Sequence, residues 1–123
     1  IRLGHFIGQE DHEYGDVSPI NKNVAEPGMI FSIEPGIYIE GSHGVRLENE
    51  LLVCEGEKNE YGEFLYFEPI TYVPFDLDAI NPDIMNAEDK ERLNTYHATV
   101  YEKVSPYLND EEKEWLKKYT RAI

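Results

Sequence analysis

The hydrophobic periodicity of this sequence changes close to Phe75, and that change restricts the folds open to the chain. Residues 1–74 carry short runs of β-branched and aromatic side chains between glycine and proline turns, a pattern typical of antiparallel strands. Beyond Phe75, apolar residues recur at helical spacing. Strands followed by helices predict an α+β fold in two parts, a sheet over 1–74 and a helical extension over 75–123.

The first part is expected to contain four strands. In chain order they cover 29–34, 37–40, 45–53 and 64–67. The turn Pro35-Gly36 ends the first strand, so the second is either a separate strand or its continuation. The polar, glycine-containing stretch 55–63 predicts an exposed hairpin loop, and 70–73 could extend the last strand.

The second part is expected to contain two helices. Asn86 and Asp89 resemble a capping box at the start of the first helix, and Pro106 ends it. Asn109 and Glu112 begin the second helix, whose first turn is acidic and so suits the helix dipole. The apolar faces that we expect in the core are Leu93, Tyr96, His97, Val100 and Val104 in the first helix, and Trp115, Leu116, Tyr119 and Ile123 in the second.

The composition excludes several classes of partner. The 123 residues include 25 acids and 11 bases, which gives a formal net charge of −14. Nucleic acids and anionic membrane surfaces bind positive protein surfaces, so we expect neither as a partner. No apolar run approaches the roughly 20 residues of a membrane span. The single cysteine, Cys54, allows no internal disulfide and suits a reducing compartment, so we expect a buried thiol in a cytoplasmic protein.

Two groups of residues in the first part suit metal chemistry but also have plainer interpretations. His5 and His12 lie in a glycine-bounded segment near carboxylates, where they are either metal ligands or hydrogen-bonding loop histidines. Glu34 ends an apolar run, and a carboxylate in a buried strand needs a cation or another partner. Simple alternation instead places Ser32 and Glu34 on a solvent-exposed face, and the periodicity alone favours that interpretation.

A third group surrounds Arg46. Arg46 and Glu48 project from the same face of the expected strand, because side chains alternate along a strand. They form either a surface ion pair of small energy or a metal ligand with a partner that orients it. The residues alone leave these two interpretations open.

In their order along the chain and in their sequence motifs, these groups resemble one enzyme family. His5, His12, the segment 28–38 (GMIFSIEPGIY) and the segment 44–49 (GVRLEN) are similar to the metallopeptidase family of methionine aminopeptidase, prolidase and aminopeptidase P. The second part resembles the C-terminal extension of the larger aminopeptidase P enzymes at 67–74, at 93–97 and at Trp115-Leu116. The resemblance covers essentially the whole chain. It implies the C-terminal portion of a pita-bread fold, an antiparallel sheet, followed by a two-helix extension.

The resemblance also implies a site for two divalent metal ions. In such enzymes two aspartates from earlier strands are joined by one histidine and two glutamates, which match His5, Glu34 and Glu48. His12 matches a histidine that binds the scissile peptide and steadies the tetrahedral intermediate. Arg46 matches an arginine that supports the ligands, and Glu34 would also carry a proton as a catalytic residue. Ligands rich in oxygen suit Mn(II), with Co(II) or Zn(II) as alternatives.

The function that the resemblance implies is hydrolysis of an N-terminal Xaa-Pro bond by a hydroxide that two metal ions share. The expected partners are a proline-containing peptide and a second copy of the intact protein. The alternatives are a prolidase- or creatinase-like hydrolase of the same fold, or a non-catalytic pita-bread module that binds peptides. The sequence after Pro74 disfavours the first, and the retained His5, Glu34 and Glu48 disfavour the second.

The beginning of the sequence predicts that the chain is a piece of a longer protein. It opens with Ile1-Arg2-Leu3-Gly4, without an initiator methionine or a signal-peptide pattern. Both aspartate ligands of the family would lie before Ile1. We therefore expect the 123-residue chain to be inactive by itself.

Overall fold

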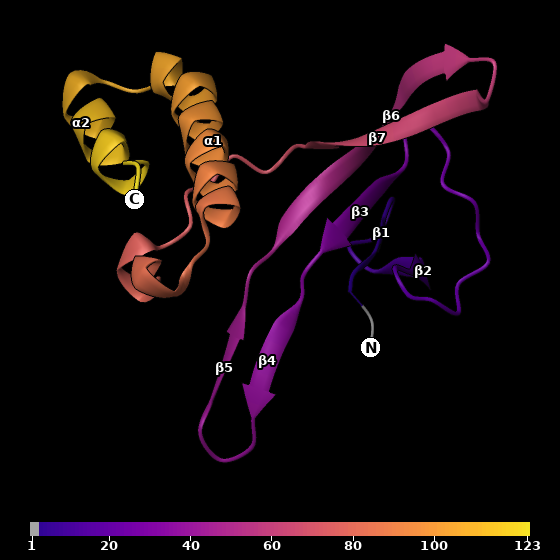
Figure 1. Ribbon diagram of the computed structural model, residues 1–123, viewed down its shortest axis with the longest axis horizontal. Coiled ribbons are helices and arrows are strands. Elements are labelled where there is room, and N and C mark those ends of the chain that lie inside the picture. The colour runs from indigo at the N-terminus through magenta and orange to yellow at the C-terminus, as the bar shows by residue number, and fades with distance from the viewer. Residues whose placement is uncertain (1–2) are drawn as a thin grey trace. The chain divides into compact units, whose positions relative to one another are not determined.

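The computed structural model describes residues 3–123, apart from the side chain of Tyr14. The first two residues, on which the expectation about the chain's beginning rests, lie outside the described part. The chain forms two compact units, here called the sheet unit (Ile1–Thr71) and the helical unit (Tyr72–Ile123) (Figure 1). Strands in the first and helices in the second confirm the α+β class. The domain division expected after residue 74 stays a prediction.

Seven strands make up the described part of the sheet unit. They are β1 (His5–Ile7), β2 (Glu13–Asp16), β3 (Ile30–Ile33), β4 (Gly36–Ile39), β5 (His43–Arg46), β6 (Asn49–Asn59) and β7 (Gly62–Pro69). Five of them form an antiparallel sheet in the order β2-β1-β3-β6-β7, and β4 pairs with β5 in a separate antiparallel hairpin. The strands expected at 29–34, 37–40 and 64–67 are confirmed as β3, β4 and part of β7.

Other expectations about the strands are wrong. The strand expected over 45–53 is interrupted at Leu47-Glu48, between β5 and β6. The loop expected over 55–63 is mostly strand, because β6 and β7 extend across it and leave Glu60-Tyr61 as the turn. β1 and β2 were not expected as strands. They are only three and four residues long, which is too short for an alternating apolar pattern to stand out in the sequence.

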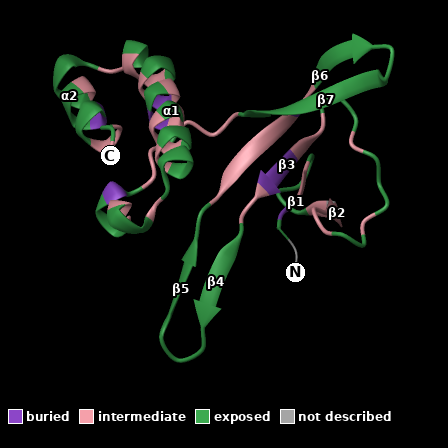
Figure 2. Cartoon of the chain, viewed as in Figure 1, coloured by how far each residue is buried: buried purple, intermediate pink, exposed green. Residues whose placement is uncertain are grey.

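The core of the sheet unit is small. Phe31 and Val53 are its buried apolar side chains within the described residues. The rings of Phe6 and Phe67 pack on Phe31, with centroid distances of 4.1 and 6.2 Å. Ser32 is also fully buried. Every residue of β4, β5 and β7 is exposed, so most of the apolar strand surface lies outside this core (Figure 2).

The helical unit confirms both expected helices. Its elements are the 3-10 turns η1 (Leu77–Ala79), η2 (Pro82–Ile84) and η3 (Ser105–Tyr107) and the helices α1 (Ala87–Val104) and α2 (Asp110–Tyr119). The Asn86 side chain accepts the N–H of Asp89 at the start of α1. At α2, Asn109 and Glu112 form a complete capping box. These bonds satisfy N–H groups that have no acceptor inside the helix.

The core of the helical unit differs from the expected one at Trp115. The buried side chains are Leu77, His97, Val100 and Leu116. Trp115 is 57% exposed, so its expected place in the core is wrong. Successive helical residues point about 100° apart, and in α2 it is Leu116, at 2% exposure, that faces the core. The Trp115 ring instead packs on Tyr119, with centroids 4.6 Å apart.

Cys54 is the other residue whose expected burial is wrong. It is only half-buried. Its Sγ lies 3.8 Å from the Leu52 carbonyl and 3.7 Å from Glu68 Oε2.

Among the residues described, the structure contains no helix with the length and apolar character needed to cross a membrane.

Candidate metal centre

Two of the predicted ligands face each other across a break between two pairs of strands. The flanking backbone pairs are Ile33 with Asn49 in the β3–β6 ladder and Gly36 with Arg46 in the β4–β5 ladder. The register is the same on both sides of the break. It therefore places Glu34 directly opposite Glu48.

Proline explains why the ladder breaks at this point. Pro35 has no N–H to donate, so regular pairing cannot pass through it. The strands nevertheless stay together, because the N–H of Leu47 donates to the Pro35 carbonyl at 3.3 Å. The N–H of Glu34 turns to the other neighbour and donates to the Leu3 carbonyl at 2.7 Å. The Glu34 backbone is thus fixed while its carboxylate remains at the junction of the ladders.

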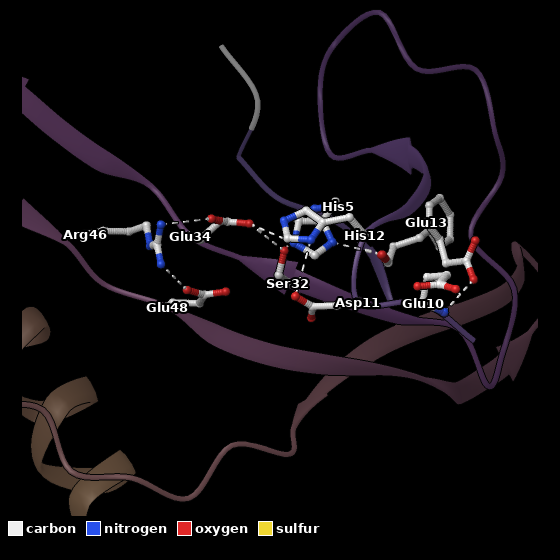
Figure 3. Close-up of polar contacts among 10 residues, drawn as sticks. His5, Glu10, Asp11, His12, Glu13, Ser32, Glu34, Arg46 and Glu48 are labelled. Atoms are coloured by element: carbon white, nitrogen blue, oxygen red, sulfur yellow. Dashed lines mark hydrogen bonds and ion pairs between the residues drawn. The ribbon is translucent and has the colours of Figure 1, made fainter. Parts of the chain in front are cut away.

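Arg46 lies between the two carboxylates (Figure 3). Its Nη1 is 3.8 Å from Glu34 Oε2, and its Nη2 is 3.2 Å from Glu48 Oε2. Like charges that face each other across a strand pair repel, and the guanidinium compensates for this. The charge of Glu48 contributes most to raising the pKa of Arg46 above its ordinary value, followed by a hydrogen bond that the guanidinium donates to the Tyr38 oxygen and by the charges of Tyr38 and Glu34. The three side chains form a charge cluster in which one positive charge offsets part of two negative charges.

His5 reaches Glu34 from the neighbouring strand β1. Its Nε2 lies 3.1 Å from Glu34 Oε1, and its Nδ1 lies 2.9 Å from the Phe6 carbonyl oxygen. A carbonyl can only accept, so Nδ1 carries a proton. Nε2 faces the carboxylate, and at this separation a proton or a metal cation must lie between the two atoms. A backbone carbonyl on the second nitrogen is also the usual support of a metal-binding histidine.

His12 lies beside this group. Its ring stacks on the His5 ring, with centroids 4.1 Å apart. Its Nδ1 is 3.3 Å from Asp11 Oδ2, and the side chain is 74% exposed. His12 is therefore adjacent to the predicted ligands and open to solvent, and its role toward a substrate stays a prediction.

The solvent-face interpretation of β3 is wrong. Ser32 is fully buried, and the Glu34 side chain is only 21% exposed. The Ser32 hydroxyl accepts the N–H of His5 and donates to Glu34 Oε1, at 3.0 Å each. Our reasoning from the sequence missed this residue. The signal was available, since a hydroxyl two positions from a carboxylate on one strand shares its face.

The donor set fits a divalent metal in its chemistry. One imidazole and two carboxylates converge from three strands or strand ends, and carboxylate oxygen with imidazole nitrogen suits Mn(II), Co(II) or Zn(II). Within residues 3–123, however, no three His, Cys, Asp or Glu side chains gather closely enough to hold an ion. Glu34 meets His5 directly but is linked to Glu48 through Arg46. The ligand assignment of His5, Glu34 and Glu48 stays a prediction.

The sequence matches two parts of one family. Residues 2–55 match metallopeptidase family M24, and residues 63–123 match the C-terminal region of peptidase_M24. The chain belongs to metallopeptidase family M24. This confirms the family resemblance that the motifs indicated.

The family assignment is supported by relatives across kingdoms. The chain is 37% identical to Xaa-Pro aminopeptidase 2 of Homo sapiens and 38% identical to aminopeptidase P1 of Arabidopsis thaliana, in both cases over 98% of its own length. It spans about a fifth of these relatives, 19% and 20% of their lengths. The chain is therefore similar to a part of these much longer proteins.

A solved structure confirms the fold. X-prolyl aminopeptidase of Caenorhabditis elegans, a cytosolic enzyme with a di-nuclear active site, matches with a TM-score of 0.82 and 26% sequence identity. The match covers 99% of this chain and 21% of that one. The expected C-terminal portion of the pita-bread fold with its two-helix extension is thus confirmed.

Proposed function

We propose that this chain is the C-terminal part of a metal-dependent aminopeptidase that hydrolyses the bond between an N-terminal residue and proline. The observation that carries the proposal is the position of Glu34. One of its oxygens faces the His5 imidazole, and the other faces the Arg46 guanidinium opposite Glu48. A carboxylate shared in this way supports a metal-bridging role in a chain whose relatives are Xaa-Pro aminopeptidases.

His5, Glu34 and Glu48 would hold two divalent ions together with ligands from other parts of the protein. Mn(II) is the preferred metal, because the donor set is rich in oxygen and contains no thiolate. When bound, the two ions would supply Lewis acidity and an activated water for attack on a peptide carbonyl.

The other roles belong to the chain's own side chains. Glu34 would accept a proton from the attacking water and pass it to the departing amine. His12, exposed beside His5, would bind the scissile peptide and donate a hydrogen bond to the developing oxyanion. Arg46 would keep both glutamates oriented and reduce their mutual repulsion.

The proposal extends to partners and location. The substrate would be a peptide with proline in its second position, and the intact protein would be a cytoplasmic homodimer. The acidic composition supports a partner other than nucleic acid or an anionic membrane. The cytosolic relative from C. elegans supports the location.

The test uses the full-length protein that carries this sequence. It is incubated with a Xaa-Pro-Xaa tripeptide, the matching Xaa-Ala-Xaa tripeptide and a Xaa-Pro dipeptide, and the products are separated by chromatography. We expect cleavage of the first bond of the proline tripeptide, loss of this activity with EDTA, and recovery with Mn(II).

The alternatives predict other outcomes. Cleavage of the dipeptide alone would identify a prolidase-like enzyme. Binding of the proline tripeptide without any cleavage, in a protein loaded with Mn(II), would identify a non-catalytic module. Either result would overturn the proposed function.

A further inference from the structure

Ser32 is the most completely enclosed polar side chain beside the candidate metal centre. It has no exposed surface, and it lies in β3, the central strand of the five-stranded sheet. Its backbone pairs with Glu50 of β6. On the other side the chain approaches so closely that a Cβ on Gly4 would lie 1.7 Å from the Ser32 carbonyl oxygen. The serine is therefore held from both neighbouring strands.

The hydrogen-bond pattern around Ser32 has one consistent direction. The His5 N–H donates to Ser32 Oγ at 3.0 Å, so the hydroxyl acts there as an acceptor. An ionised carboxylate can only accept, so the single hydroxyl proton is directed at Glu34 Oε1, also at 3.0 Å. The result is a fixed connection from the backbone of β1 to the carboxylate at the end of β3.

The connection acts on the same oxygen that faces the His5 ring. Glu34 Oε1 is 3.1 Å from His5 Nε2, whereas Glu34 Oε2 faces Arg46 at 3.8 Å (Figure 3). The carboxylate thus lies between a neutral donor on one side and a cation on the other. Without the hydroxyl, the pull of the guanidinium on the carboxylate would meet less opposition, and rotation toward Arg46 would draw Oε1 away from His5.

We propose that Ser32 is a positioning residue that holds Glu34 Oε1 at His5 Nε2, so that both atoms present their lone pairs to one divalent cation. This inference rests on the proposed function, because it assigns to Ser32 a role in the metal affinity of that site. Ser32 does not touch the ion and acts through Glu34.

The test measures Mn(II) binding to the full-length protein by calorimetry, with the electron paramagnetic resonance spectrum of bound Mn(II) as a second readout. Ser32→Ala removes the hydroxyl. Ser32→Thr and Ser32→Val have nearly the same shape and differ in the hydroxyl alone, so they separate its effect from packing. Ser18→Ala is the matched control, because the Ser18 hydroxyl donates to Asp16 Oδ1 at 2.7 Å, likewise two residues away but outside the site.

We expect Ser32→Ala and Ser32→Val to bind Mn(II) roughly 10- to 100-fold more weakly with an altered spectrum, as other partners of metal ligands do. Ser32→Thr and Ser18→Ala should remain close to the unmodified protein. Should Ser32→Ala fail to fold, the Thr and Val pair decides. Equal Mn(II) affinity of Ser32→Thr and Ser32→Val would overturn the positioning role of Ser32 but not the proposed function. Absence of divalent-metal binding in the unmodified protein would overturn the proposed function as well.

Discussion

Among the residues that the structure describes, the sheet unit and the helical unit each bury one polar side chain completely, and the two side chains have different roles. In the sheet unit, Ser32 accepts from His5 and donates to Glu34. In the helical unit, His97 Nε2 accepts the N–H of Phe75 at 3.0 Å, while within the described part of the chain its Nδ1 has no hydrogen-bond partner. The serine orients the Glu34 carboxylate, whereas the histidine hydrogen-bonds the segment before η1 to helix α1.

The two units also differ in how their secondary structure is supported. Ile37, Tyr38 and Val45 in the β4–β5 hairpin are 70%, 68% and 59% exposed (Figure 2). A two-stranded hairpin with so little support is marginally stable in water. The helical unit instead completes its helix ends with side-chain caps. The sheet unit therefore carries the candidate chemistry on a framework that needs further contacts, and the helical unit has a more self-contained framework.

The largest expected effect is on turnover, which variants of the sheet unit should lower and a variant of the helical unit should not. In the full-length protein, His5→Ala removes a predicted metal ligand. It should therefore lower the metal content and reduce kcat by about 1,000-fold or more. His12→Ala should lower kcat by roughly 100- to 1,000-fold and keep the metal, because it removes an oxyanion donor. His97→Gln, in the helical unit, should leave turnover close to normal. Metal analysis and peptide-cleavage kinetics give both readouts; loss of metal from His12→Ala but not from His5→Ala would reverse our assignment.

Stability should show the next largest difference, at a glycine of the sheet unit. Gly4→Ala places a Cβ 1.7 Å from the Ser32 carbonyl, so β1 and β3 must separate. We expect a loss of about 3 kcal/mol in the free energy of unfolding, measured by urea denaturation of the full-length protein. Gly8→Ala is the control, since its new Cβ would meet the flexible Glu13 side chain at 3.0 Å. Equal stability of the two variants would contradict the close approach of the strands.

Association should reveal the open surface of the sheet unit. We expect the 123-residue chain by itself to self-associate as its concentration rises, in sedimentation velocity, because the β4–β5 hairpin exposes apolar side chains. Ile37→Lys should reduce this association. Ile84→Lys changes a side chain of the helical unit that is 83% exposed, and it should not. A monodisperse monomer with a sharp melting transition would refute the expectation.

The smallest expected effect is a pH dependence confined to the helical unit. Burial, and to a lesser extent the charge of Arg121, lowers the pKa of His97 below its ordinary 6.5. As the pH falls below 6.5, the unfolded state therefore takes up the proton first, and stability decreases. Urea unfolding followed by the fluorescence of Trp115, the single tryptophan, should show this decrease between pH 7 and 5.

A pair of histidine variants tests this assignment. His97→Gln should flatten the decrease in stability between pH 7 and 5, because it removes the titrating group but keeps an acceptor for the Phe75 N–H. His43→Gln changes an exposed residue at the start of β5 and should retain the decrease. The same slope in both variants would show that another group is responsible.

The helices were predictable because their signals are local. The Asn86 and Asn109 caps and the helical spacing lie within one segment of sequence each, and both helices were found where expected. The relation between Glu34 and Glu48 was not predictable in this way. It depends on a register that continues past Pro35, and a register is a property of two distant segments.

The error at Ser32 has a similar origin. Alternation predicts a solvent face only for a strand with one face open to water. β3 lies in the middle of the five-stranded sheet, and the consecutive residues Phe31 and Ser32 are both buried. The residues that the family motifs indicated do lie close together, since His5, His12, Glu34, Arg46 and Glu48 are all in or beside one charge cluster. Their roles stay a prediction.

The most direct test of the account is a metal count on the full-length protein by mass spectrometry after loading with Mn(II). The account predicts two ions per chain in the unmodified protein and almost none in Glu34→Ala or Glu48→Ala. Glu63→Ala should keep both ions, because that exposed glutamate pairs with Lys58 on the β6–β7 hairpin. Retention of two ions in Glu34→Ala and Glu48→Ala would contradict the claim that the facing glutamates of the sheet unit hold the metals.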